Sequence, residues 1–244
     1  MKIKEISAIT VYDSRGKPTI RTKVVLEDGS VGISSVPSGA STGKHEALEL
    51  RDNDKSRFFG LTVDCAVENV NQKITKELAG VDFKTPADLD KSLIELDGTD
   101  NKSNLGANAL LSVSQAYLKA LSVSQKKPLW KIINENYFTD IFPSFPRLMV
   151  NVVNGGKHAN FNFDIQEFMI VPKSNLPKDA VYMAAFIFSA LGKKLKKMEL
   201  STLVGDEGGY SPSLVGNEVV LKILTELGDE IGLKAGVDYH LALD

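Results

Sequence analysis

The segment Phe142-Pro143-Ser144-Phe145-Pro146 most limits the folds open to this chain, because the order of secondary structure differs on its two sides. Before it, the first 35 residues have the β-branched pattern of strands, and helical patterns follow them. After it, strand-like and helix-like segments alternate. A stretch rich in proline marks a boundary between such regions. The sequence therefore predicts two domains, residues 1–141 and 142–244.

The first domain is predicted to be α+β. Two strand-like runs flank the turn Glu27-Asp28-Gly29-Ser30, which is a hairpin signal. Apolar side chains at helical spacing predict helices at residues 63–78, 86–96 and 107–124. Strands followed by helices, without alternation, are typical of an α+β domain.

The second domain is predicted to be an α/β layer or barrel. Strands are expected at residues 148–153, 165–171, 203–204 and 239–243, and helices at 177–198 and 217–231. The first two strands are close enough in sequence to pair antiparallel, whereas the later alternation favours parallel pairing. These strands are too few to close a barrel of about eight. We therefore expect an incomplete barrel, which a longer chain or a partner chain would complete.

Composition excludes several classes of function. The formal net charge of −2 offers no basic field for nucleic acid, and no apolar run is long enough to span a membrane. The start lacks the apolar core of a secretory signal. The single cysteine, Cys65, lies in a helical pattern and is expected to be a buried, inert thiol. These features predict a cytoplasmic protein, although a cell-surface or secreted pool without a signal would leave no trace in the sequence.

The segment from Val204 to Pro212 carries two adjacent acids flanked by glycines. Apolar residues lead into Asp206 and Glu207, and the glycines let the backbone turn and let a ligand approach closely. One interpretation is a carboxylate presented to a pocket. The alternative is an acidic turn that follows a strand.

The segment from Ser38 to Glu46 is rich in small residues and includes Ser41. Its backbone N–H groups and hydroxyls are suited to an anion or a metal ion, and such a loop can close over a substrate. The alternative is a flexible surface loop.

Three further candidates lie near predicted strand ends. If the strands on either side of Gly155-Gly156 pair antiparallel, then His158 and Glu167 lie at one edge of the sheet. Gln166 and Glu167 would point to opposite faces unless a bulge or bend occurs there. Asp244 ends an apolar strand, where an α/β fold places its site residues. The alternatives are that His158 is a solvated loop histidine, that Glu167 is a charge at the edge of the sheet and that Asp244 lies at a frayed chain end.

Several segments, in order, resemble the enolase family over the whole chain. They are Asp13-Ser14-Arg15-Gly16, Ser38-Gly39-Ala40-Ser41-Thr42-Gly43, Glu46-Ala47-Leu48-Glu49-Leu50-Arg51-Asp52, Leu96-Asp97-Gly98-Thr99, Gly106-Ala107-Asn108-Ala109, Asp164-Ile165-Gln166-Glu167-Phe168-Met169-Ile170, Val204-Gly205-Asp206-Glu207-Gly208-Gly209 and Leu243-Asp244. The resemblance implies an enolase N-terminal domain followed by about half of its barrel.

The resemblance also implies reversible dehydration of 2-phosphoglycerate to phosphoenolpyruvate with two Mg²⁺ ions, which stabilise the charge of an enediolate. By this resemblance Glu207 donates a proton to the departing hydroxide. Glu167 orients that hydroxyl, and Gln166 lies beside it.

The same resemblance assigns the remaining ligands. His158 closes on the substrate near its phosphate, Ser41 binds the second Mg²⁺ and Asp244 is the first ligand of the tighter one. The lysine base of the family, two further metal carboxylates and a phosphate-holding arginine belong to the part of the family pattern that follows Asp244. Residues 1–244 alone are therefore expected to be inactive.

Two residues depart from the family pattern. Lys17 replaces the usual asparagine, and Arg21 stands where glutamate commonly makes a dimer contact, which puts that ion pair in doubt but not a homodimer or higher homo-oligomer as such. Two rival functions remain. One is a non-catalytic enolase-like scaffold or surface-binding protein, and the other is a related enzyme acting on a different carboxylate.

Overall fold

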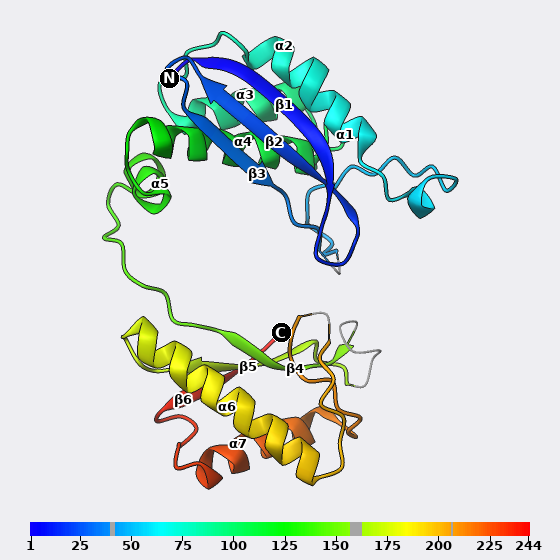
Figure 1. Cartoon of the computed structure of the whole chain (residues 1–244), viewed down its shortest axis with the longest axis vertical. Helices are drawn as coiled ribbons and strands as arrows, with labels where there is room; N and C mark the ends of the chain where they lie inside the picture. The colour runs from blue at the N-terminus through cyan, green and yellow to red at the C-terminus, as the bar shows by residue number, and fades with distance from the viewer. Residues whose placement is uncertain (40–41, 157–162, 206) are drawn as a thin grey trace. The chain divides into compact units, whose positions relative to one another are not determined.

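The computed structural model describes residues 1–39, 42–156, 163–205 and 207–244. They form two compact units, Met1–Pro143 and Ser144–Asp244 (Figure 1). Each unit has its own three-stranded sheet and its own cluster of buried apolar side chains.

The sheet of the first unit is antiparallel, in the order β1-β2-β3. Its strands are β1 (Ile3–Tyr12), β2 (Pro18–Leu26) and β3 (Val31–Ser35). The predicted hairpin between β2 and β3 is confirmed. Its turn uses Gly29 at φ +84°, which glycine adopts without strain, and Asp28 Oδ1 accepts a hydrogen bond of 2.9 Å from Ser30 N.

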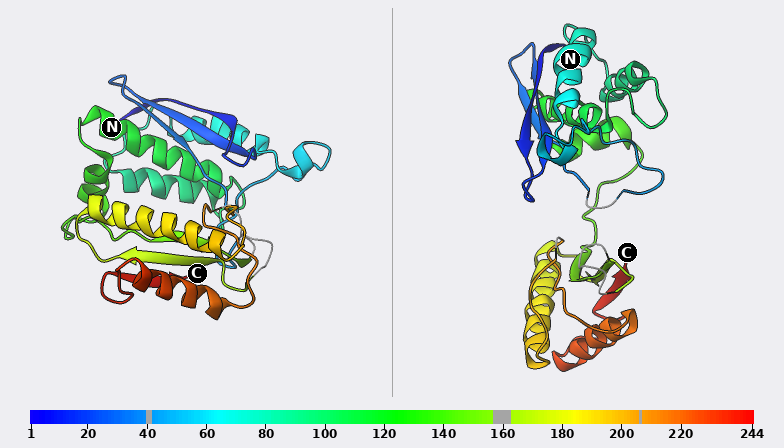
Figure 2. Two further views of the ribbon diagram at one scale, coloured as in Figure 1. Left: turned by 60° about the horizontal axis from the view of Figure 1, so that its bottom comes forward. Right: turned by 90° about the vertical axis from the view of Figure 1, so that its right-hand side faces the viewer.

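Helices gather on one face of this sheet (Figure 2). They are α1 (Asp64–Glu68), the π-helical segment η2 (Asn69–Ile74), α2 (Thr75–Leu78), α3 (Pro86–Asp97), α4 (Ala107–Ser124) and α5 (Leu129–Tyr137), with a 3₁₀ turn η1 (Phe58–Gly60) before them. The predicted helices are confirmed, and α4 has the predicted bounds. The sequence patterns do not predict the π-helical turn or α5. No helix in the described ranges is both long and apolar enough to span a membrane.

Helix α4 packs directly on the sheet. A Cβ added to Gly32 of β3 would lie 2.0 Å from the carbonyl oxygen of Ala116 and 2.3 Å from the amide nitrogen of Ala120. Only glycine allows the strand and helix backbones to come this close. Nearby, the hydroxyls of Thr22 and Ser112 share a buried hydrogen bond of 2.6 Å between β2 and α4.

The prediction that Cys65 is buried is wrong. Its side chain is exposed, because Ala66, Val70 and Ile74 form the buried stripe of this helical stretch. A hydrogen bond with the carboxylate of Asp52 and, to a lesser extent, partial burial raise the pKa of the Cys65 thiol. The thiolate is the reactive form, so exposure alone does not make this cysteine a good nucleophile.

The second unit contains an antiparallel sheet covered by helices on one face. Its strands are β4 (Val150–Asn154), β5 (Glu167–Pro172) and β6 (Tyr239–Leu243), and its helices are α6 (Pro177–Lys197) and α7 (Asn217–Glu230). Phe168 and Ile170 of β5 are fully buried in one cluster with Leu191 of α6 and Leu224 of α7. Because side chains alternate along a strand, Glu167 and Met169 belong to the other face.

The predicted parallel pairing of the last strand is wrong, because β6 pairs antiparallel with β5. The expected strand at residues 203–204 forms only an isolated bridge, Val204↔Tyr210. Consequently two helices, not one, connect β5 to β6. The chain runs back along the sheet in α6, forward in α7 and back again in β6, so β6 is antiparallel to β5 (Figure 1).

Asp97, a buried residue of the first unit, provides a test of this fold. Its carboxylate accepts hydrogen bonds from the amides of Leu105 (2.7 Å) and Thr99 (3.0 Å). Burial by itself would raise the pKa of Asp97, but a hydrogen bond from the Thr99 hydroxyl, together with these two amide bonds, outweighs burial and lowers the pKa below its ordinary value. Stability from this ionised group is therefore present above the unfolded-state pKa, near 3.8, and is lost as the pH falls through the lower folded-state pKa.

We predict that Asp97→Asn lowers the free energy of unfolding by about 1.5–3 kcal/mol at neutral pH, the range for hydrogen bonds to a charged group. The difference from the parent should shrink as the pH falls through the pKa of folded Asp97. Urea unfolding of both proteins over a pH series measures this. Asp100→Asn, at an exposed position close in sequence, is the matched control. A deficit that does not change with pH would contradict the assignment.

Candidate active site

The turn side of the β4–β5 pair brings the predicted strand ends together. Asn154, the last residue of β4, pairs with Glu167, the first residue of β5. The amide of Gly155 donates a hydrogen bond of 2.8 Å to the carbonyl oxygen of Gln166. The antiparallel pairing inferred from the sequence is therefore confirmed, and Glu167 lies at this edge of the sheet. His158 lies outside the described residues.

A β-bulge joins Gln166 and Glu167 to Asp244. The amides of Gln166 and Glu167 both donate to the carbonyl oxygen of Asp244, at 2.8 and 3.1 Å, and the amide of Asp244 donates back to the carbonyl oxygen of Glu167 at 3.1 Å. Two consecutive residues of one strand thus oppose a single residue of the next, which interrupts strict alternation and redirects a side chain. The sequence required such a bulge if Gln166 and Glu167 were to serve one site.

Glu207 lies in a tight turn that is hydrogen-bonded to β4. The amide of Gly205 donates to the carbonyl oxygen of Gly209 at 2.8 Å, and Gly208 adopts φ +80°. Tyr210 N then donates to Val152 O at 2.9 Å, and Asn154 N donates to Tyr210 O at 2.8 Å, which gives a parallel bridge with β4. The segment after Glu207 therefore runs parallel to β4, and the turn is held next to Asn154. Asp206 lies outside the described residues.

Tyr210 anchors this turn to helix α6. Its ring stacks on Phe188 with the centroids 4.3 Å apart and the planes within 7° of each other. A Cβ added to Gly192 would lie 2.4 Å from the Tyr210 hydroxyl oxygen, so the ring lies directly over the glycine. The sequence patterns do not identify Tyr210, because the contact joins residues that are distant along the chain.

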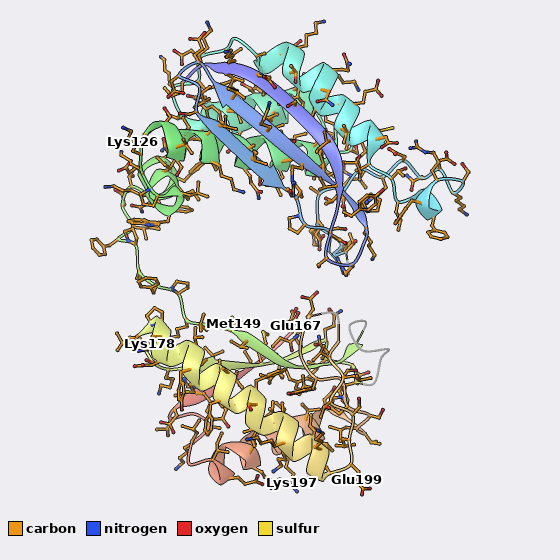
Figure 3. The ribbon with its side chains drawn as sticks, viewed as in Figure 1. Lys126, Met149, Glu167, Lys178, Lys197 and Glu199 are labelled. Atoms are coloured by element: carbon orange, nitrogen blue, oxygen red, sulfur yellow. The ribbon has the colours of Figure 1, made fainter. Side chains whose placement is uncertain are left out.

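Polar residues line the sheet face opposite the helices. Residues directly across an antiparallel pair share a face, so Asn154 lies on the same face as Glu167, and Asn151 on the same face as Met169. Figure 3 shows Glu167 at the start of β5. Asn154 is fully buried, and sequence reasoning missed both asparagines.

Gly209 fits the turn against these asparagines. A Cβ added to it would lie 2.7 Å from Asn154 Oδ1, 2.9 Å from Asn151 Oδ1 and 2.9 Å from the backbone nitrogen of Val153. Any side chain here would push the turn away from β4. Gly209 therefore sets the close approach of the Glu207 turn to the polar face.

Asp244 has the right kind of donor for Mg²⁺, which prefers oxygen ligands in an octahedral array. Within the described ranges, no group of three His, Cys, Asp or Glu side chains is placed to hold a metal ion. The donor chemistry fits a magnesium ion, but the described residues supply only part of a coordination shell. Ser41, the other predicted ligand, lies outside them.

The chain on both sides of residues 40–41 is anchored within the first unit. Ser38 Oγ donates to Glu49 Oε2 at 3.0 Å and accepts from Arg51 Nη2 at 3.1 Å, and Arg15 donates to the carbonyl oxygen of Ser38. After the gap, Gly43 N donates to the carboxylate of Glu46 at 2.7 Å. The motifs around Asp13 and Glu49 therefore hold the ends of the Ser41 segment.

Two family models match the chain. The enolase N-terminal domain matches residues 3–133, and the enolase C-terminal TIM barrel domain matches residues 143–244. Together with the α+β first unit and the strand-end carboxylates of the second, these matches define an enolase-type α/β protein. The chain belongs to the enolase family. The open sheet of the second unit agrees with the predicted incomplete barrel.

The packing of the Glu207 turn gives a testable prediction. Gly209→Ala should destabilise the second unit by about 1–3 kcal/mol, as overpacking does, because the new methyl collides with the backbone of β4. Amide hydrogen exchange should show lost protection at Asn154 and Tyr210, whose amides form the hydrogen bonds between this segment and β4.

The matched control is Gly208→Ala. No described atom lies within 4 Å of a Cβ added there, but φ is +80°. This variant should lose about 1–2 kcal/mol through left-handed strain and keep both amides protected. Equal protection in the two variants would show that Gly209 is not a packing requirement.

Proposed function

We propose that this chain carries the acid side of an enolase site and acts in the reversible dehydration of 2-phosphoglycerate to phosphoenolpyruvate. The observation that supports the proposal best is the convergence of three segments at one sheet edge. Backbone hydrogen bonds link Glu167 to Asp244 through the bulge, and link the Glu207 turn to β4 next to Asn154. Membership of the enolase family supplies the reaction class.

In this proposal the carboxyl group of Glu207 gives its proton to the hydroxyl that leaves C3, which departs as water. Backbone hydrogen bonds hold the turn that carries Glu207 next to β4, and general acid catalysis of this kind contributes about 10²–10⁴-fold in rate. Glu167 orients that hydroxyl. Gln166, brought beside Glu167 by the bulge, contacts the substrate from the same edge.

Enolases in general use Mg²⁺, which would stabilise the negative charge that develops on the substrate carboxylate. Asp244 would hold the tighter ion, and Ser41 the second. His158 would lie near the substrate phosphate. These three assignments rest on the resemblance of the motifs to the family.

The proton at C2 must be removed by a base. None of the described strands β4, β5 and β6 carries a lysine. By the resemblance of the motifs to the family, the lysine base belongs to the part of the family pattern that follows Asp244. Accordingly, we propose that the activity belongs to the complete barrel, and that residues 1–244 alone do not turn over substrate.

The rival proposal is a non-catalytic enolase-like scaffold or surface-binding protein. It would keep the fold and not need the strand-end acids. Cytoplasmic location and a homodimer or higher homo-oligomer remain proposals. In the first unit Arg21 Nε donates a hydrogen bond of 2.9 Å to Ser35 Oγ on the neighbouring strand, so the Arg21 side chain has a partner within its own chain.

We predict that Glu207→Gln in the full-length gene product lowers kcat by about 10²–10⁴-fold, the range of general acid catalysis, with a much smaller change in KM. Glutamine keeps the shape but cannot donate an acidic proton. Phosphoenolpyruvate formation from 2-phosphoglycerate in the presence of Mg²⁺ measures this.

Glu199→Gln is the matched control, because it removes a carboxylate from the same unit at a position well away from Glu167 (Figure 3). Residues 1–244 alone serve as a second control and should show no turnover. An unchanged kcat in Glu207→Gln would remove this residue from the acid role, and absence of turnover in the parent would favour the scaffold.

A further inference from the structure

Asn151 and Asn154 have buried side-chain amides with no hydrogen-bond partner among the described residues. Both the Oδ1 and Nδ2 atoms of each are affected, and Asn154 is fully buried. A buried polar group without a partner has given up its hydrogen bonds to water and gained none in return, which destabilises the folded state. Such groups are rare in folded proteins, and each one calls for an explanation.

Asn108 shows what a structural asparagine looks like in this chain. It is also buried, but its carboxamide accepts a hydrogen bond from Leu50 N and donates one to Leu50 O, each 3.1 Å long. That side chain holds a loop to helix α4, and both its oxygen and its nitrogen have a hydrogen-bond partner. Asn154 is as buried and has neither bond.

The location of Asn154 points to a role in the site. It is paired directly with Glu167, on the same face, where opposite Cβ atoms lie about 4.5–5.5 Å apart. On its other side, Oδ1 lies against Gly209 in the turn that carries Glu207. A carboxamide that can both donate and accept hydrogen bonds therefore lies between Glu167 and the turn that carries Glu207.

We infer that Asn154 is a positioning residue for the reaction: it donates a hydrogen bond to the carboxylate of Glu167 in the substrate-bound state and keeps the Glu207 turn in register with it. Asn151, beneath the same glycine, supports the turn. This inference rests on the proposed function. It explains why two costly amides occur on an otherwise apolar strand, since polar groups held ready for a reacting state reduce stability in the resting one.

The test is Asn154→Leu in the full-length gene product, which replaces the carboxamide by an apolar group of similar shape. Because the amide has no partner to lose, the midpoint of urea unfolding should stay the same or rise. The kcat for 2-phosphoglycerate should fall about 10–100-fold, as for supporting residues of other sites, with KM changed much less. The split between a large fall in kcat and a small change in KM separates a positioning role from a loss of substrate binding.

Asn108→Leu is the matched control. It should lower the unfolding midpoint, because both hydrogen bonds to Leu50 are lost, and it measures how much stability a structural asparagine of this chain contributes. Asn154→Ser, which keeps a small donor and acceptor, should recover part of the lost kcat and serves as the second variant if leucine prevents folding.

Three outcomes would overturn the inference. An unchanged kcat in Asn154→Leu would do so while leaving the proposed function intact. A loss of stability equal to that of Asn108→Leu, with no recovery of kcat in Asn154→Ser, would make Asn154 structural. A parent protein without turnover would remove the proposed function and the positioning role together.

Discussion

The carbonyl oxygen of Asp244 accepts hydrogen bonds from two consecutive amides, those of Gln166 and Glu167, and the arrangement of the second unit depends on this contact. The bulge fixes the register of β6 against β5 and breaks the alternation that would separate the two side chains. A second set of backbone bonds, between Tyr210 and β4, brings the Glu207 turn to the neighbouring strand end. Backbone hydrogen bonds alone thus hold residues of three segments next to one another.

The two faces of this sheet have different roles: one packs against the helices and stabilises the unit, and the other carries the polar side chains of the candidate site. Phe168 and Ile170 bury one face against α6 and α7, and the stacked rings of Tyr210 and Phe188 tie the turn to α6. The opposite face keeps Asn151, Asn154 and Glu167. Burial of apolar surface on one side therefore offsets the cost of the Asn151 and Asn154 amides, which have no hydrogen-bond partner among the described residues.

Much of this fold is predictable from sequence, and the errors have physical causes. Strong periodicity gives α4 and β6 their observed bounds. The prediction that β6 pairs in parallel is wrong because the apolar run Leu203–Val204 is too short to form a strand. Without that strand the chain reverses direction an odd number of times between β5 and β6, so the two strands pair antiparallel. The prediction that Cys65 is buried fails for a different reason. The phase of the helix decides which of its side chains are buried, and the residue type does not.

The candidate site is predictable only where a motif marks it. Strand-end position and family motifs indicate Gln166, Glu167, Glu207 and Asp244, whereas Ser41 and His158 remain predictions outside the described residues. Asn154 and Tyr210 are not predictable in this way, because their significance lies in contacts with Gly209 and α6 that form only on folding. The pairing pattern that places Asn154 beside Glu167 is the signal that could have found it, once the register was known.

A crystal structure of the full-length gene product with Mg²⁺ and 2-phosphoglycerate tests the central claim most directly. The convergence of the three segments predicts that Glu167 and Glu207 contact the same bound substrate and that Asp244 coordinates a metal ion beside it. A structure in which these carboxylates face separate surfaces, or in which substrate binds elsewhere, would contradict it.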